Sequence, residues 1–258
     1  MKTLLSVITL SLCLTLSAQS YIQLEVISLK EGQEDEYLKI EEFYSEVKRL
    51  AVEKGLQSGW AVFKNIPNDQ NKIEGLSYPD YMVFNLFDSK EQMEQEIDFN
   101  SLTIMAHKGK TKKKIIKKMI SNWAEPRKET RYYTYKRISN TEWGLGEFKK
   151  GMKMFGAAVQ QLDESYIDYE LKFFKKYHDQ QIKTKERGWW ELNEIISSSD
   201  NALKEMTHII FEAPGPMWGK IENPAPDFTQ KMMTENGLKT RKIWPHFEMD
   251  LQYFAFKN

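Results

Sequence analysis

An internal repeat is the feature of this sequence that most constrains its fold. The segment 59–66 opens with Gly59-Trp60 and matches the segment 188–195, which opens with Gly188-Trp189. A second match, at identical internal spacing, pairs Trp123, Tyr132, Tyr133, Tyr135 and Lys136 with Trp244, Tyr253, Phe254, Phe256 and Lys257. Because the two matches occur in the same order along the chain, they predict two copies of one structural unit, residues 19–139 and 140–258.

Each copy is predicted to run strand, helix, strand, strand, helix, strand. In the first copy, 22–26 alternates apolar and polar residues, 37–51 has helical spacing, and 60–66, 81–87 and 130–138 have the composition of strands. In the second copy the corresponding segments are a helix over 167–182, strands over 189–195 and 207–213, and a last strand that ends at Phe256. The weakest signal belongs to its opening strand, expected near 152–159, where Gly156 interrupts a poor alternation.

This order of elements, with Gly-Trp entering the second strand, resembles the dimeric α+β barrel superfamily, which includes antibiotic-biosynthesis-monooxygenase-like and stress-responsive barrel domains. The resemblance covers nearly the whole chain after residue 18. It implies an α+β fold in which two ferredoxin-like βαββαβ units pair their antiparallel sheets into a barrel with the helices outside. Since one chain supplies both units, a monomer would form a complete barrel, or a homodimer of such barrels would form.

Fold alone does not select a function within that superfamily, whose members include cofactor-independent oxygenases, haem-degrading enzymes and relatives of haem peroxidases. The haem-degrading members carry an Asn on the first strand and a His on the second helix. This chain offers His107 in the helical region, but 21–29 contains no Asn. A haem-degrading reading is therefore disfavoured, and the sequence identifies no cofactor.

The N-terminal segment predicts export. Residues 1–18 combine Lys2, an apolar stretch from Leu4 to Leu16 and a small-residue end at Ala18, which is typical of a secretory signal peptide. Its cleavage would remove Cys13, the one cysteine, so disulfides and thiolate chemistry are excluded in the mature chain. No later stretch approaches the length of a membrane span, and we expect a periplasmic or secreted protein.

The charge balance argues against nucleic-acid partners. Lys and Arg total 37, and so do Asp and Glu, which leaves no overall attraction for a polyanion. The lysine-rich run 108–118 is best interpreted as the solvated face of a helix, although an acidic glycan, phosphate or membrane surface could use it.

Comparison of matched strands gives the catalytic candidates. Where the first copy has Val62, Met82 and Leu86, the second has Glu191, His208 and Glu212. His208 and Glu212 share one strand face with Ile210 between them, so His208 could act as acid or base while Glu212 orients it. The ordinary alternative is that both side chains are solvated or paired at a sheet edge.

Indole side chains give the ligand-binding candidates Trp189, Trp190 and Trp218, together with Glu191. Aromatic faces could line a pocket for a flat hydrophobic molecule, and Trp218 lies in the Pro- and Gly-rich segment 213–226, which could form a binding loop. Core packing of the indoles and an ordered surface loop are the alternatives.

His246, Glu248 and Asp250 alternate and could share a strand face, but their spacing matches no metal motif, and we predict no metal site. Phosphate-binding loops, serine-nucleophile elbows and zinc-protease helices are also missing from the sequence.

The sequence thus leaves three classes of function open. The leading hypothesis is an exported protein that binds a small, partly aromatic or hydrophobic molecule in its second unit. The alternatives are an oxygenase-like or other small-molecule enzyme, and a structural or interaction module without a pocket.

Overall fold

A closed antiparallel β-barrel forms the centre of the molecule. The computed structural model describes residues 20–68, 72–221 and 225–257, so the predicted signal segment 1–18 lies outside the described residues. The barrel strands are β1 (Tyr21–Leu29), β2 (Gly59–Ile66), β3 (Tyr81–Phe87), β4 (Arg127–Asn140), β5 (Lys153–Gln161), β6 (Arg187–Ser198), β7 (His208–Pro214) and β9 (Phe247–Phe256). They pair in the order β7-β6-β4-β1-β3-β2-β9-β5, and a further β7–β5 pairing closes the ring. The short strand β8 (Arg241–Ile243) pairs with β5.

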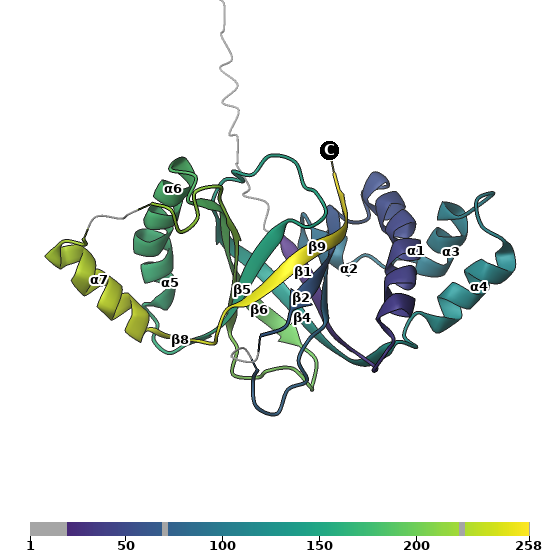
Figure 1. Cartoon of the computed structure of the whole chain (residues 1–258), viewed down its shortest axis with the longest axis horizontal. Helices are drawn as coiled ribbons and strands as arrows, with labels where there is room; N and C mark the ends of the chain where they lie inside the picture. Colours follow the sequence, from purple (N-terminus) through teal and green to yellow (C-terminus); the bar gives the residue numbers. More distant parts are fainter. Residues whose placement is uncertain (1–19, 69–71, 222–224, 258) are drawn as a thin grey trace, which may run out of the picture.

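The helices lie outside this barrel, in two groups on opposite sides (Figure 1). One group consists of α1 (Glu34–Glu53), α3 (Phe99–Ala106) and α4 (Lys113–Asn122); the short α2 (Lys90–Glu94) follows β3. The other group consists of α5 (Tyr166–Tyr169), a π-helical segment (Glu170–Phe174), α6 (Lys175–Lys183) and α7 (Phe228–Lys239). None of the helices in the described residues is long and apolar enough to span a membrane. The predicted α+β fold class, with antiparallel sheets closed into a barrel and helices outside, is confirmed.

The two halves of the barrel have the same strand order. In the first half β4, β1, β3 and β2 lie side by side, and in the second half β9, β5, β7 and β6 do so. The halves meet at two joints, β2–β9 and β4–β6, each of which pairs the second strand of one half with the last strand of the other. A single chain therefore supplies every strand that closes the barrel.

The opening strand of the second half forms over Lys153–Gln161, where the sequence signal was weakest. Gly156 does not interrupt it. A Cβ atom at this position would lie 2.1 Å from the Phe247 ring, so the glycine lets an aromatic side chain of β9 pack against the strand backbone.

The two Gly-Trp pairs begin equivalent strands but direct their indoles to opposite faces. Trp60 is fully buried in the layer between the barrel and α1, with Tyr37 and Val62. Trp189 packs against the core inside the barrel, and its neighbour Trp190 takes the outward position. The pairing of β6 with β7 shifts register between Arg187 and Trp189, and such a shift by one residue moves every following side chain to the other face.

The matched positions in the repeat do not share an environment, either in β6 or in β7. Val62 faces the helix layer, whereas Glu191 points into the barrel. Met82 points into the barrel, whereas His208 faces outward. The matched pairs therefore do not compare the same side of the barrel wall, although Glu191 does line the barrel interior.

Candidate functional site

Two cavities that described residues line lie inside the barrel, one toward each end, and they have no lining residue in common. Between them lies an aromatic layer in which Phe84 packs edge-on against Phe63 and Phe211, and Phe211 packs edge-on against Tyr135. We name each cavity after one residue that lines it, Trp189 or Arg131.

The Trp189 cavity has a volume of about 300 Å³ and lies at the end where β1, β2, β5 and β6 begin. Its lining residues are Ile22, Ala61, Phe63, Phe84, Leu86, Arg137, Asn140, Trp143, Phe148, Met154, Trp189, Glu191, Phe211 and Phe256. The connection 141–152 passes over this end of the barrel (Figure 1).

This connection is held in place by both backbone and aromatic contacts. The Gly144 N–H donates to the Gly188 carbonyl of β6 over 2.8 Å. Trp143 stacks on Phe148 with 4.4 Å between ring centroids and packs against Trp189 at 5.8 Å. Phe148 also contacts Phe256 of β9 at 4.2 Å. The cavity is therefore walled by indole and phenyl rings from three parts of the chain.

Glu191 is the acidic group of this cavity, and none of its surface is exposed. It forms an ion pair with Arg137 of β4 and accepts a 3.0 Å hydrogen bond from the Asn193 side chain. Burial raises the pKa of the Glu191 carboxyl above its ordinary value, against the opposing effect of the Arg137 charge. Glu191, Arg137 and Asn140 thus make one polar corner in an otherwise apolar cavity.

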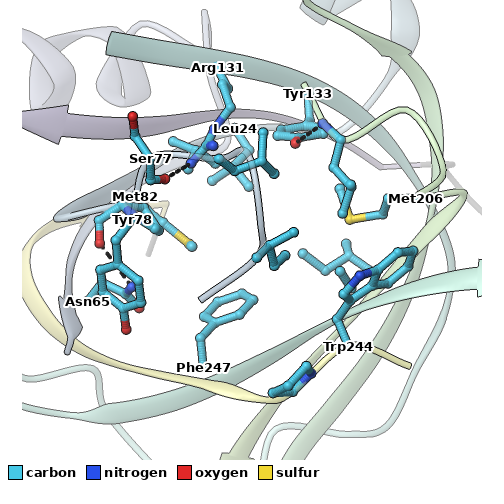
Figure 2. A pocket seen from close by; sticks show the side chains of 18 of the residues that line it. Leu24, Asn65, Ser77, Tyr78, Met82, Arg131, Tyr133, Met206, Trp244 and Phe247 are labelled. Carbon is cyan, nitrogen blue, oxygen red and sulfur yellow. Dashed lines mark hydrogen bonds between the residues drawn. The ribbon is translucent and has the colours of Figure 1, made fainter. Parts of the chain in front are cut away.

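The Arg131 cavity lies toward the opposite end and is smaller, about 90 Å³ (Figure 2). The walls are mainly apolar side chains, among them Leu24, Met82 and Met206, and Trp244 lies to one side. Segments of the β2–β3 and β6–β7 connections, including Ser77, Tyr78 and Leu203, complete the lining.

Strand β4 links the two cavities. Its residues Arg131, Tyr133, Tyr135 and Arg137 alternate and all point into the barrel; the first three line the Arg131 cavity, and Arg137 lines the Trp189 cavity. The tyrosines predict this strand, whereas Arg131 and Arg137 are not among the site residues predicted from the sequence. The sequence could have indicated them, because side chains two residues apart on a strand share a face and the tyrosines identify that face as the buried one.

The residues predicted from the sequence divide between the inside and the outside of the barrel. Trp189 and Glu191 line one cavity together. Trp190, His208, Glu212 and Trp218 lie outside the barrel, so the structure does not gather the whole predicted set into one pocket. Alternation along β6 explains why Trp190 points outward, because it lies between the inward residues Trp189 and Glu191.

His208 and Glu212 share the outer face of β7, as expected, but each contacts other groups. The His208 Nδ1 atom lies 2.9 Å from the Thr207 hydroxyl, and its ring packs edge-on against Tyr166. Burial lowers the pKa of His208 to about 4. Glu212 forms an ion pair with Arg187 of β6 and lies 3.7 Å from the His246 ring nitrogen.

Trp190 and Trp218 belong to the outer layers of the second half. Trp190 is buried under α6 and stacks on His178 at 4.9 Å. Trp218 stacks on Phe155 at 5.9 Å and lies over the Arg187 guanidinium, with 38 % of its surface exposed. In this structure both indoles pack against neighbouring side chains outside the barrel.

The remaining histidine and carboxylate candidates do not form a cluster. Within the part of the chain that the structure describes, no group of three or more His, Cys, Asp or Glu side chains is arranged to hold a metal ion. Glu248 forms an ion pair with Lys153 instead. His107 is buried between α3 and α1, where it stacks on Phe43 at 3.9 Å.

Solved structures show the same architecture. A proposed monooxygenase from Lactobacillus acidophilus NCFM aligns over 92 % of this chain and 96 % of its own, with a TM-score of 0.53 and 9 % identity. One from Fusobacterium nucleatum subsp. nucleatum ATCC 25586 aligns over 93 % and 96 %, with a TM-score of 0.52 and 9 % identity. An anthrone oxidase-like protein aligns over 92 % and 93 %, with a TM-score of 0.50 and 10 % identity.

No family model and no curated protein matches the sequence. At this level of identity the structural likeness shows the fold. The chain has the dimeric α+β barrel fold, with both βαββαβ halves of the barrel in one polypeptide.

Proposed function

We propose that this protein binds a small, flat aromatic molecule in the Trp189 cavity. The observation that carries the proposal is a 300 Å³ interior space walled by aromatic rings, with its polar groups confined to one corner. Cavities of this size with mainly apolar walls and a few convergent polar groups are typical of small-molecule sites. The stacked and edge-on indole and phenyl faces suit a planar ligand.

The polar corner supports a ligand that carries an oxygen substituent. The Glu191 carboxylate can accept a hydrogen bond from a phenol, and the guanidinium of Arg137 can donate to a ring carbonyl or phenolate. The proteins of similar fold include an anthrone oxidase-like protein, whose name refers to an aromatic ketone. A phenol or aromatic ketone is therefore the ligand class that we propose.

A titration with 1-naphthol, followed by calorimetry, tests this proposal. We expect saturable binding that Ala61→Leu abolishes, since the larger side chain would fill the cavity. The matched control is Ala158→Leu, which makes the same change on a strand that lines the other cavity and should leave naphthol binding unchanged. Naphthalene, which lacks the hydroxyl, should bind more weakly than naphthol by about 1 kcal/mol, roughly one hydrogen bond.

Absence of binding, or equal loss in both leucine variants, would contradict the proposal and favour an interaction module.

The buried Glu191 favours a second candidate, an enzyme that removes a proton from its bound aromatic molecule. A carboxylate whose pKa is raised by burial is a stronger base than one in water, and it lies in the cavity wall. Under nitrogen in D₂O, we expect the protein to accelerate exchange of the methylene protons of anthrone, followed by NMR. Glu191→Gln should remove the acceleration while naphthol still binds, because the glutamine carbonyl can still accept the hydrogen bond from the naphthol hydroxyl. An exchange rate equal to that without protein would eliminate this candidate.

We also propose that the protein is exported and that residues 1–18 are removed. The support is the sequence of that segment, a basic start followed by an apolar stretch and a small-residue end. The mass of the protein isolated from the extracellular and periplasmic fractions of its host tests this. A product beginning at residue 19 is expected, and an intact cytoplasmic chain would contradict it.

A further inference from the structure

Arg131 is the one arginine without a carboxylate partner among the described residues. Each of the others forms an ion pair with an acidic side chain: Arg49 with Glu46, Arg127 with Glu25 and Glu41, Arg137 with Glu191, Arg187 with Glu212, and Arg241 with Glu170. Arg131 is nevertheless only 3 % exposed. A buried cation without a counter-charge is costly, so proteins rarely keep one without a use for it.

The contacts of the Arg131 guanidinium leave part of it free. Its Nη2 atom donates a 2.8 Å hydrogen bond to the Ser77 carbonyl, which fixes the side chain against the β2–β3 connection. The buried Nη1 atom has no hydrogen-bond partner in the described part of the chain. Figure 2 shows the side chain entering the cavity from β4, with Leu24 beside it. A positively charged donor is thus held in a fixed position against apolar walls.

Two more unsatisfied polar atoms lie around the same cavity. The hydroxyl of Tyr135 and the side-chain carbonyl of Asn65 are both buried without a hydrogen-bond partner among the described residues, and both residues line the cavity. The Tyr135 hydroxyl and the Arg131 guanidinium are donors, so an acceptor bound in the cavity would satisfy two of these three atoms.

We propose that the Arg131 cavity is a binding site for the carboxylate of a small organic acid. Arg131 would bind the carboxylate through Nη1, and the acid's hydrocarbon part would lie against Leu24, Met82 and Met206. A carboxylate supplies the negative charge and the acceptor that the guanidinium lacks. The volume of about 90 Å³ is less than the roughly 150 Å³ that holds benzene, so the acid has fewer non-hydrogen atoms than benzene does.

Calorimetric titration of the full chain with sodium propionate tests the site. We expect propionate to bind, 1-propanol to bind far more weakly and inorganic phosphate not to bind, because the apolar walls cannot solvate its second charge. Arg131→Met should weaken propionate binding roughly ten- to hundredfold, the usual loss for a charge-assisted hydrogen bond. Ala158→Leu should abolish binding by filling the cavity, and Ala61→Leu at the other end should leave it intact.

A stability measurement separates a binding role from a structural one. If Arg131 is kept for a ligand, Arg131→Met removes an uncompensated buried charge and should raise the melting temperature of the ligand-free protein. If Arg131 is structural, the variant should melt earlier or fail to fold. The proposal is overturned by that result, by wild-type protein that does not bind propionate, by phosphate binding as tightly as propionate, or by propionate binding that Ala61→Leu removes.

Discussion

At the scale of single residues, paired charges are the main polar feature of the buried regions. Glu191 with Arg137 and Glu170 with Arg241 each join a carboxylate that has almost no exposed surface to an arginine from another element of the fold. Removing one member of such a pair leaves the other as an unpaired buried charge, which is strongly destabilising. Arg131 is in that unpaired state in the folded chain, which sets it apart from the other arginines.

His208 carries a prediction about acid stability. Its folded-state pKa of about 4 lies below the ordinary 6.5 because burial disfavours the charged ring. Between these values the unfolded chain binds a proton that the folded chain does not, so stability is lost as the pH falls from about 6.5 to about 4. The full effect of this shift is about 3 kcal/mol.

His208→Phe keeps an aromatic ring against Tyr166 and removes the titration. Urea unfolding at pH 7.5 and pH 4.5 should show that this variant loses less stability on acidification than the wild-type protein. An equal loss in both proteins would mean that His208 does not resist protonation in the folded state.

At the scale of elements, α1 and α6 end in the same way with different residues. After α1, the Gly55 N–H donates to Val52 and the Leu56 N–H donates to Ala51. After α6, Lys185 and Glu186 make the equivalent bonds to Ile182 and Gln181. Gly55 and Lys185 both have positive φ, at 70° and 60°, and Lys185 is the one described non-glycine residue that does. The left-handed conformation costs a residue with a Cβ about 1 kcal/mol or more.

The exchange of these two residues gives a matched test. We expect Lys185→Gly to raise the free energy of unfolding by about 0.5–1 kcal/mol and Gly55→Lys to lower it by a similar or larger amount, both measured by urea denaturation. A Lys185→Gly variant that is less stable than the wild-type chain would show that the lysine side chain makes a contribution larger than its backbone strain.

At the scale of the whole molecule, barrel closure depends on both halves. In the first half alone, β2 and β4 would be edge strands, because their outer partners β9 and β6 belong to the second half. The interior face of the sheet, with Phe63 and Phe84, would also be exposed to water. Open edges beside an apolar face favour association with another sheet.

A fragment comprising residues 20–140 should therefore form a dimer in which β2 of each copy pairs with β4 of the other, in place of the β2–β9 joint of the full chain. Light scattering coupled to size-exclusion chromatography measures its mass, and near-ultraviolet circular dichroism reports its packing. A monomeric fragment with native-like packing would show that a half-barrel is stable by itself.

The sequence alone determined the class and order of the main elements, but not β8 or the division of the region between β3 and β4 into three helices. Period-two alternation and helical spacing are local properties, so a strand over 81–87 and a helix over 37–51 could be recognised without knowledge of their neighbours. The repeated order resembles the dimeric α+β barrel superfamily, and the barrel that this resemblance implies, with both halves in one chain, agrees with the strand pairing. Residues 189 and 191 could be assigned to one face for the same reason.

Only the tertiary structure decided which face is the inside and which residues meet there. A register shift near Gly188 reversed the face of β6 relative to its match β2, and a local pattern does not reveal such a shift. Charge partners are likewise a property of strands far apart in the chain. Arg137 finds Glu191 across the β4–β6 joint, whereas Arg131, on the same face of β4, finds no carboxylate among the described residues. Arg131 and Arg137 belong to one strand, and their environments differ because the closed barrel places different side chains opposite each of them.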